Sequence, residues 1–183
     1  MRKKSDTYHH GALKESILLN ASQIIAENGS VDFSIRDISN ACKVSPAAIY
    51  KHFKSRNEIA VKLALQGVSL LKEEFDLISN SKSPGLLKYC KAYINFAKEN
   101  EGHFRAIYFK KICSMDEFQE VESITDQLYA YLLESIDTKT SLKKDDYKIK
   151  KILACIHGVS FLIIDNCAEF SEKEIDKILK DVI

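Results

Sequence analysis

Long apolar runs are missing from this sequence, and their absence argues against two classes of protein. No segment approaches the roughly 20 apolar residues that a membrane-spanning helix needs. The positive charges of Arg2, Lys3 and Lys4 are not followed by an apolar stretch before Tyr8, so the N-terminus does not resemble a secretory signal. We therefore expect neither a membrane protein nor a secreted one.

Paired cysteines are also missing. The five cysteines are odd in number, scattered, and never separated by two residues. This usage is typical of thiols in a reducing cytoplasm, not of a disulfide framework. Cys155 and His157 form a C-x-H pair, but on a helix they point to different faces, and no third ligand or carboxylate is suitably spaced. We expect core packing there, a cytoplasmic location, and no metal or cofactor.

A strong net charge is absent from the whole chain but not from its parts. The formal net charge is +1 at pH 7. Residues 1–58 carry nine Lys/Arg against six Asp/Glu, whereas residues 59–183 carry eighteen against twenty. The N-terminal part is therefore the candidate for contact with an anionic partner.

Prolines are few and strand-like alternation is absent, which favours an all-α fold. Both prolines, Pro46 and Pro84, follow a serine, and each pair marks a helix start with the serine as its cap. Ser34 is expected to cap a short helix, and Ser171 with Glu174 forms a capping box before the last helix. The first expected helix ends near Asn28. The others are expected over 34–42, 45–54, 55–78, 84–99, 102–112, 117–137, 145–168 and 171–182.

Two domains are predicted, residues 1–54 and residues 55–183. The segment Ser79–Gly85, rich in turn-forming residues, is the clearest break in the chain, and the helices after it are longer and richer in aromatic residues. A helix over 55–78 would be roughly 36 Å long. It is long enough to leave the first domain and enter the second.

The segment "VSPAAIYKHFKSRNEI", residues 44–59, has an unusual polar face. On a helix that starts at Ser45, Ile49 and Phe53 share the inward side, whereas Ala47 and Lys51 point the opposite way. A face of small residues and a lysine can approach another surface closely. Insertion into the major groove of DNA requires such a face.

The preceding short helix completes a helix-turn-helix arrangement, in which the second helix reads bases and the first contacts phosphates. Ser34 offers a hydroxyl and backbone N–H groups to a phosphate, and Arg36 adds a charge. Tyr50 and His52 suit phosphate oxygens at the groove edge, and Arg56 lies at the start of the next helix. These five side chains are the expected backbone contacts.

Three linked segments resemble the TetR/AcrR family of transcriptional regulators. They are Tyr8-His9-His10-Gly11 leading into the first helix, "FSIRDIS" over 33–39, and "VSPAAIYKHFKSRNEI" over 44–59. The match covers about residues 8–60 in motif, and the whole chain in length and helix order. The resemblance implies a helix-turn-helix DNA-binding domain followed by a helical ligand-binding and dimerisation domain.

Carried over by position, the resemblance assigns roles to ten residues. It implies phosphate contacts for Ser34 and Arg36, proximity to bases for Pro46, Ala47, Ala48 and Lys51, with Ser45 at the helix start, and backbone anchoring for Tyr50, His52 and Arg56. The chain departs from the family pattern at two positions. Lys43 stands where the turn usually has glycine. A lysine in a left-handed conformation costs about 1 kcal/mol, so the turn is expected to differ slightly. Arg56 replaces a more usual lysine, which should keep the phosphate contact.

An effector pocket and a dimer interface are predicted in the second domain. Aromatic and histidine side chains supply the apolar walls and polar tips of a pocket for a largely apolar small molecule, although most could be plain core. The pocket candidates are Tyr89, Tyr93, Phe96, Phe104, Tyr108, Tyr129, His157 and Phe161. The last two amphipathic helices carry apolar stripes that one chain alone would leave partly exposed, so they are expected to pair with a second copy. The interface candidates are Ile149, Ile152, Ile156, Val159, Ile163, Ile175, Ile178, Leu179 and Val182.

The leading hypothesis is a homodimeric repressor that binds a palindromic DNA operator and is released by a small molecule. An alternative is a DNA-architecture or protein-interaction protein with the same fold and no small ligand. An enzyme is disfavoured, because no nucleophile, base and orienting group come together in the sequence. Release from DNA by a ligand would separate the first hypothesis from the second.

Overall fold

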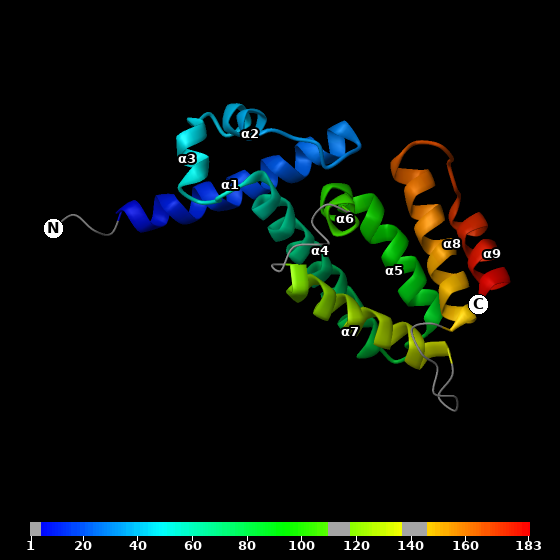
Figure 1. Ribbon diagram of the computed structural model, residues 1–183. Coiled ribbons are helices and arrows are strands. Elements are labelled where there is room, and N and C mark those ends of the chain that lie inside the picture. The colour runs from blue at the N-terminus through cyan, green and yellow to red at the C-terminus, as the bar shows by residue number, and fades with distance from the viewer. Residues whose placement is uncertain (1–4, 110–117, 137–145) are drawn as a thin grey trace. The chain divides into compact units, whose positions relative to one another are not determined.

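The computed structural model describes residues 5–109, 118–136 and 146–183, with side chains from Ala12 onward. These residues form helices and no strand, which confirms the predicted all-α class. Tyr8, His9 and His10 fall within the first helix, and their side chains lie outside the described residues. The helices, labelled in Figure 1, are α1 (Ser5–Asn28), α2 (Ile35–Ala41), α3 (Pro46–Tyr50), α4 (Arg56–Ser79), α5 (Leu86–Glu99), α6 (Glu101–Ile107), α7 (Gln119–Ile136), α8 (Tyr147–Ile164) and α9 (Glu172–Val182).

Three of the predicted helix caps are confirmed. Ser34 caps α2, and Ser45 caps α3 with Pro46 as its first residue. Ser171 and Glu174 form the predicted capping box at the start of α9. In each case the serine hydroxyl accepts a hydrogen bond from a backbone N–H three residues later, which satisfies a donor that the helix leaves unpaired.

The predicted start of α5 is wrong. Gly85, not Ser83, is the N-cap, and its carbonyl accepts hydrogen bonds from the N–H groups of Lys88 and Tyr89 at 2.9 and 3.3 Å. The hydroxyl of Ser83 instead accepts a hydrogen bond from the Lys88 ammonium at 2.7 Å. Pro84 therefore lies outside the helix, and no side chain caps α5.

Three helices end earlier than predicted. α3 ends at Tyr50, because the N–H of His52 turns back to the carbonyl of Ile49 in a tighter turn. α6 ends at Ile107, and the described residues 108 and 109 are not helical, so the predicted extension of this helix is wrong for those two residues. α8 ends at Ile164, because Asn166 adopts a left-handed conformation with φ 53°, which stops an α-helix.

The chain divides into two compact units, Met1–Gln66 with Glu101–Phe118, and Gly67–Asn100 with Gln119–Ile183. The boundary between the units falls inside the continuous helix α4. The two units are defined by how compactly their residues pack, and this does not show which residues bind DNA or an effector. The division into domains at residue 54 therefore stays a prediction.

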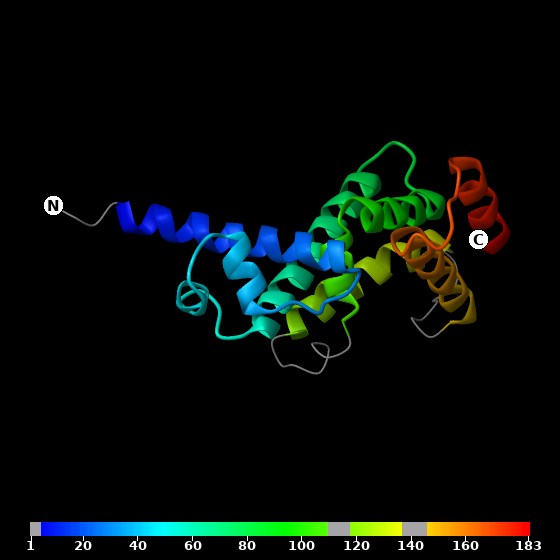
Figure 2. The same cartoon turned by 90° about the horizontal axis from the view of Figure 1, so that it is seen from above.

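In the first unit, α1 packs along α6 and α2. Figure 2 shows α2 and α3 on one side of α1. The α1 and α6 helices approach closely at Gly102 of α6, where an added Cβ would lie 2.1 Å from the carbonyl oxygen of Ser22 in α1. Beside it, the Ser22 hydroxyl and His103 Nδ1 are 3.2 Å apart and share a hydrogen bond. Only glycine allows α1 and α6 to meet backbone to backbone at this point.

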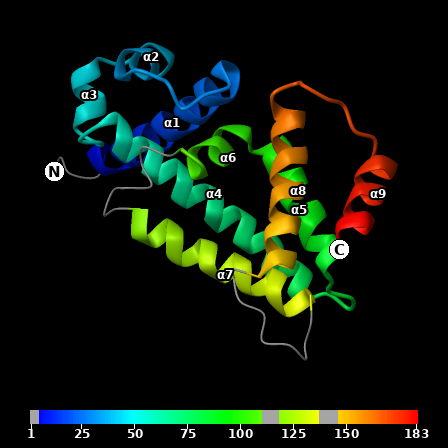
Figure 3. The same ribbon diagram turned by 45° about the vertical axis from the view of Figure 1, so that its right-hand side comes forward.

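In the second unit, α8 packs along α5, and α9 contacts both of them (Figure 3). The apolar stripe of α8 is buried there, with Ile149, Ile152 and Ile156 fully inaccessible. An ion pair between Lys91 of α5 and Asp176 of α9 closes the outer side of this layer. α7 packs against α5.

The described residues contain neither a candidate membrane span nor a candidate metal cluster. None of the helices there combines the length and apolar character needed to cross a bilayer. No three His, Cys, Asp or Glu side chains in that part of the chain gather closely enough to hold a metal ion.

Candidate nucleic-acid interface

The start of α2 is closed by a reciprocal capping box. The N–H and the hydroxyl of Ser34 both donate to the Asp37 carboxylate, at 2.8 and 2.6 Å, and the N–H of Asp37 donates to the Ser34 hydroxyl oxygen at 3.1 Å. The side-chain and backbone hydrogen bonds from Ser34 lower the pKa of Asp37 below its usual value. Both donors of Ser34 are therefore engaged inside the cap, and its predicted phosphate contact would have to share them. Arg36 is exposed beside this cap.

The turn between α2 and α3 contains a left-handed lysine. Lys43 has φ 55°, so the turn keeps the conformation that glycine usually adopts, and the expected difference in the turn is wrong. Its N–H donates to the carbonyl of Asn40 at 3.1 Å, and the N–H of Val44 donates to the carbonyl of Ser39 at 2.9 Å. These two bonds define a Schellman motif, the helix ending in which glycine is the usual residue at the left-handed position.

The two faces of α3 are as the helical wheel predicted. Ile49 is buried and so is Phe53 just beyond the helix, whereas Ala47 and Lys51 are exposed. Tyr50 is 56% exposed. The remaining predicted contacts are also accessible: Ser45 and Pro46 are exposed, and Ala48 and His52 are half-buried. The structure thus leaves the candidate base-reading face open.

Arg56 is engaged within the protein, which the sequence did not indicate. Its Nη1 lies 2.9 Å from the Asp32 carboxylate and donates to the carbonyl of Phe33 at 3.2 Å. Its guanidinium also lies over the Phe33 ring, 5.9 Å from the centroid. These contacts tie the start of α4 to the segment before α2. A separation of 24 residues carries no sequence signal for such a pair, and the predicted role of Arg56 as a phosphate anchor stays a prediction.

Polar contacts from α1 hold the C-terminal end of α2. The hydroxyl of Ser16 and the amide of Asn20 donate to the sulfur of Cys42, at 3.7 and 3.5 Å. Elsewhere on α1, the Lys14 ammonium lies 5.7 Å from the centroid of the Phe53 ring. The α1 helix therefore supports the helix-turn-helix through contacts with Cys42 and Phe53.

The eight predicted pocket residues divide between the two units. Phe104 and Tyr108 belong to the first unit, where their rings contact each other with centroids 5.2 Å apart. The other six belong to the second unit: Tyr89, Tyr93, Phe96, Tyr129, His157 and Phe161. The assignment of these residues to an effector pocket is not tested by the structure and stays a prediction.

Two of the six form a polar pair between α5 and α8. The Tyr93 hydroxyl lies 3.1 Å from Nδ1 of His157, and the two rings stack with centroids 5.3 Å apart. Burial lowers the pKa of His157 from its ordinary value, because desolvation disfavours the charged imidazolium. The sequence indicated a polar tip in this region but could not indicate its partner.

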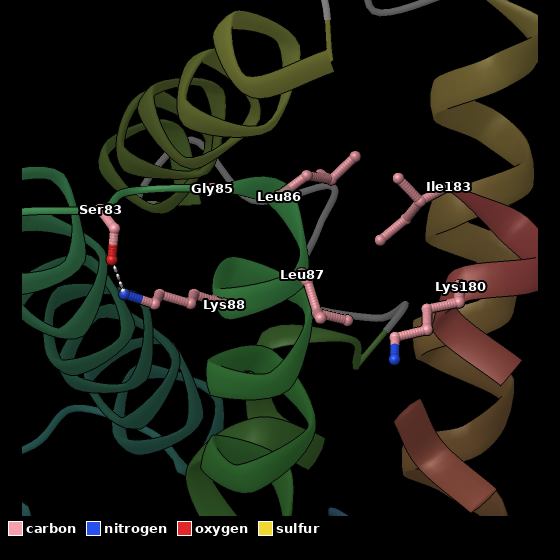
Figure 4. Close-up of a pocket in the computed structure, with 7 residues that line it drawn as sticks. All are labelled: Ser83, Gly85, Leu86, Leu87, Lys88, Lys180 and Ile183. Carbon is pink, nitrogen blue, oxygen red and sulfur yellow. Dashed lines mark hydrogen bonds between the residues drawn. The ribbon is translucent and has the colours of Figure 1, made fainter. Parts of the chain in front are cut away.

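A pocket of about 530 Å³ lies beside the start of α5 and the end of α9 (Figure 4). Leu86, Leu87 and Ile183 line it, and Figure 4 shows Lys180 at its edge. Another pocket, of about 360 Å³, lies between α4 and α5 and includes Phe96. Phe96 is thus a predicted pocket residue that lines one of these two hollows.

The predicted dimer residues are largely covered within one chain. Six are buried, namely Ile149, Ile152, Ile156, Val159, Ile175 and Leu179, and three are half-buried, namely Ile163, Ile178 and Val182. The expectation that a single chain leaves these stripes partly exposed is wrong for the six buried residues. The reason is that α8 already packs on α5 and that α9 already covers both.

A different face of α8 is exposed. Ala154 and Gly158 are accessible, and Leu162 is 42% exposed. A Cβ added to Gly158 would meet no atom within 4 Å. These three residues lie four positions apart, so they form one stripe along the helix.

Comparisons with known proteins agree with this geometry. Residues 17–63 match the family model described as bacterial regulatory proteins, tetR family. The chain is 23% identical over 172 residues to YobS, an uncharacterized HTH-type transcriptional regulator of Bacillus subtilis (strain 168), covering 92% of this chain and 87% of that protein.

Solved structures share the fold across nearly the whole chain. PfmR, a TetR family transcriptional regulator from Thermus thermophilus, superposes with a TM-score of 0.69 at 18% identity, covering 90% of this chain and 93% of that one. AibR, solved in complex with isovaleryl coenzyme A and operator DNA, gives 0.71 at 14% identity, covering 93% and 96%. The family match, the relative and the shared fold agree: residues 17–63 are a helix-turn-helix segment of the tetR family of bacterial regulatory proteins, and the chain as a whole has the fold of TetR family transcriptional regulators.

Proposed function

We propose that this regulator is a repressor that binds a palindromic operator as a homodimer and leaves it when a small, largely apolar molecule binds. The observation that carries the proposal is the outward face of α3, where Ala47 and Lys51 are exposed opposite the buried Ile49 and Phe53. Such a face enters a major groove without obstruction from bulky side chains.

On the operator, α3 supplies the reading residues. Pro46, Ala47 and Ala48 at its start contact base edges and thymine methyl groups, and Lys51 donates to a guanine edge. The phosphates on either side are bound by Arg36, the exposed Tyr50 and the other predicted anchors. The donors of Ser34 and Arg56 already bind the carboxylates of Asp37 and Asp32. To bind a phosphate, each residue must either share its donors with that carboxylate or give the carboxylate up.

Two copies are required, because one helix of five residues makes few base contacts and a two-fold dimer doubles them. For the interface we propose the exposed stripe of α8, Ala154, Gly158 and Leu162, together with the half-buried Ile163 and residues of α9. Small residues on this stripe allow two helices to approach closely. The buried isoleucines of α8 support that face from within the chain.

The effector is proposed to bind among the aromatic side chains of α5, α7 and α8. The buried Tyr93 and the half-buried His157 provide a polar pair among apolar neighbours, which can orient a molecule that is otherwise apolar. AibR, which shares this fold, was solved with both a ligand and operator DNA bound. That precedent supports a ligand-responsive regulator without identifying the ligand here.

The response is proposed to reach the DNA-binding helices through α4 and α6. α4 is one continuous helix whose residues belong to both units, and α6 meets α1 backbone to backbone at Gly102 and Ser22. A shift of either helix on effector binding would displace the helix-turn-helix. Effector and operator then bind with opposing preferences, which is a coupling between two sites.

Selection of bound duplexes from a random pool tests the proposal. We expect a palindrome with two half-sites about one helical turn apart, bound with two chains per duplex. The selected duplex then serves as the probe in a screen of small apolar compounds for release. A selected site without two-fold symmetry, bound by one chain, would overturn the dimeric repressor.

A further inference from the structure

Three described residues adopt the left-handed region of backbone conformation, and they differ in how well they suit it. Gly29, after α1, has φ 63°, Asn166, after α8, has φ 53°, and Lys43, after α2, has φ 55°. Glycine has no Cβ to clash in this region, and asparagine is among the side chains that tolerate it best. Lysine has neither advantage.

The endings of α2 and α8 have the same hydrogen bonding, so the difference does not come from geometry. At both, the left-handed residue and its successor donate back to carbonyls of the last helical turn, at 3.1 and 2.9 Å after α2 and at 3.0 and 2.9 Å after α8. The position of Lys43 therefore has the same conformational demand as that of Asn166. A residue retained against that demand points to a role for its side chain.

The side chain of Lys43 is free to serve such a role. It is exposed, and within the part of the chain that the structure describes its ammonium makes no hydrogen bond or ion pair. It precedes Ser45, the cap of α3, by two residues. In a helix-turn-helix the N-terminal end of the second helix contacts base edges, so the residues just before it run close to the phosphates that border the groove.

We propose that Lys43 is an additional phosphate contact on DNA, one that this chain gains by placing lysine in a turn that favours glycine. The inference rests on the DNA-binding function and on no property of the effector site. The ammonium on a long flexible stem acts as a point charge, so it recognises a backbone phosphate and not a particular base. It also displaces one condensed counterion for each subunit bound.

A second explanation for the lysine is local. A cation at the C-terminal end of α2 interacts favourably with the helix dipole, which would stabilise the fold without touching DNA. The two explanations differ in what is lost when the charge is removed. The dipole explanation predicts a loss of stability alone, whereas the phosphate contact predicts a loss of salt-dependent DNA affinity.

Four variants of the full chain separate these explanations. Lys43→Gln removes the charge and keeps a side chain of similar length in the same conformation, whereas Lys43→Arg keeps the charge. Lys43→Gly removes the charge and relieves the conformation. Lys82→Gln is the matched control, because Lys82 is exposed in the second unit and also lacks a described partner, so the change in net charge is the same.

The measurement is the affinity for a duplex of random sequence, followed by fluorescence anisotropy between about 50 and 200 mM salt. Each phosphate contact contributes about 0.9 to the salt slope, so a fourfold salt dilution tightens binding by about 3.5-fold per contact. We expect Lys43→Gln and Lys43→Gly to lose one such factor per subunit, and Lys43→Arg and Lys82→Gln to keep the wild-type slope. The selected operator should show the same loss.

The outcomes are distinct. A wild-type slope for Lys43→Gln overturns the phosphate contact, and if that variant also melts earlier, the helix-dipole explanation holds instead. A loss on the selected operator alone, with an unchanged slope, would make Lys43 a base contact and also overturn this inference. A wild type that binds no duplex at all overturns the DNA-binding function itself.

Discussion

Each of the two compact units has an apolar core of its own, and the units differ in the polar and aromatic contacts that accompany that core. In the first unit, polar atoms fix particular positions: Asn20 donates to Cys42, and Arg56 pairs with Asp32. The buried Arg105 donates to Glu101 on the preceding turn of α6, at 2.8 Å. These contacts are specific in distance and direction, so they hold the helix-turn-helix in one geometry.

The second unit has aromatic contacts within its apolar core. Phe75, Tyr89 and Tyr131 form an aromatic cluster with centroids 4.8 to 6.0 Å apart. The Tyr131 hydroxyl donates to Asp76, which also accepts from Lys72, and the bond to Asp76 raises the pKa of Tyr131 to about 12. Apolar packing has no fixed direction and tolerates rearrangement. Under the proposed function, we expect the directional contacts of the first unit to keep the helix-turn-helix in one geometry and the aromatic cluster of the second unit to rearrange when an effector binds.

The largest expected effect concerns the apolar layer of the second unit. Ile156 is fully buried, so Ile156→Asp places an unpaired charge in the core and should destabilise the chain by more than about 4 kcal/mol. Leu162→Asp changes an exposed position and should leave the stability of the chain within about 1 kcal/mol. Urea unfolding gives both free energies.

Sedimentation then separates folding from association for the same pair of variants. We expect folded monomers from Leu162→Asp and no folded chain from Ile156→Asp. If Ile156→Asp were folded and monomeric, Ile156 would belong to the dimer interface after all. If Leu162→Asp were fully dimeric, the exposed stripe of α8 would not be part of that interface.

The next effect concerns the close backbone contact between α6 and α1 at Gly102 and Ser22. Gly102→Ala places a methyl group against the backbone of Ser22 and should cost about 3 kcal/mol, because neither helix can give way without losing its own hydrogen bonds. Gly85→Ala is the matched control, because an added Cβ there meets no atom within 4 Å and its φ of 177° is open to any residue. Thermal melting of both variants checks the difference. Equal stability of Gly102→Ala and wild type would show that α6 is free to slide on α1.

DNA affinity gives the third comparison, between a reading residue and an anchoring one. Lys51→Ala should cost about 1 to 3 kcal/mol on the selected operator and relax preference at one base pair per half-site. Arg56→Ala should weaken operator and random DNA alike and lower the salt slope by about one per subunit. It should also cost up to about 1 kcal/mol of stability, because the exposed pair with Asp32 is lost. Equal losses for Lys51→Ala on both DNAs would make Lys51 a backbone anchor.

The accuracy of the sequence predictions depends on how far apart the residues concerned lie along the chain. The caps of α2, α3 and α9 and the two faces of α3 depend on residues within a few positions of one another, so local chemistry was sufficient. The stripe of α8 was recognised as apolar, but an apolar stripe does not specify its partner, and it packs on α5 of the same chain. The pairs Arg56 with Asp32 and Tyr93 with His157 join distant residues, and only the fold brings them together.

One half-buried histidine in each unit gives a pH comparison. Burial lowers the pKa of His103 in the first unit and of His157 in the second. The unfolded chain, with a histidine pKa of about 6.5, then binds more protons than the folded one, so stability rises with pH in this range. We expect stability to fall as pH decreases from about 7, until the lower folded pKa is passed. His103→Gln and His157→Gln should each flatten this slope in urea unfolding at several pH values, and a slope unchanged in both variants would contradict the assignment.

The smallest effect concerns the two left-handed helix endings, which share a geometry and differ in residue. Lys43→Gly removes a strained conformation that costs about 1 to 2 kcal/mol for an ordinary side chain, and it adds about 0.5 to 1 kcal/mol of backbone entropy cost. The net gain should be about 0.5 kcal/mol, less any favourable interaction of the charge with α2. Asn166→Gly should change stability by less, because asparagine already tolerates φ 53°.

The informative result is a Lys43→Gly chain that is as stable as wild type or more so, and that binds DNA more weakly. Stability and affinity would then change in opposite directions at one residue, as expected where function retains a conformation that folding disfavours. A variant that loses both stability and affinity would instead make Lys43 part of the support for α2.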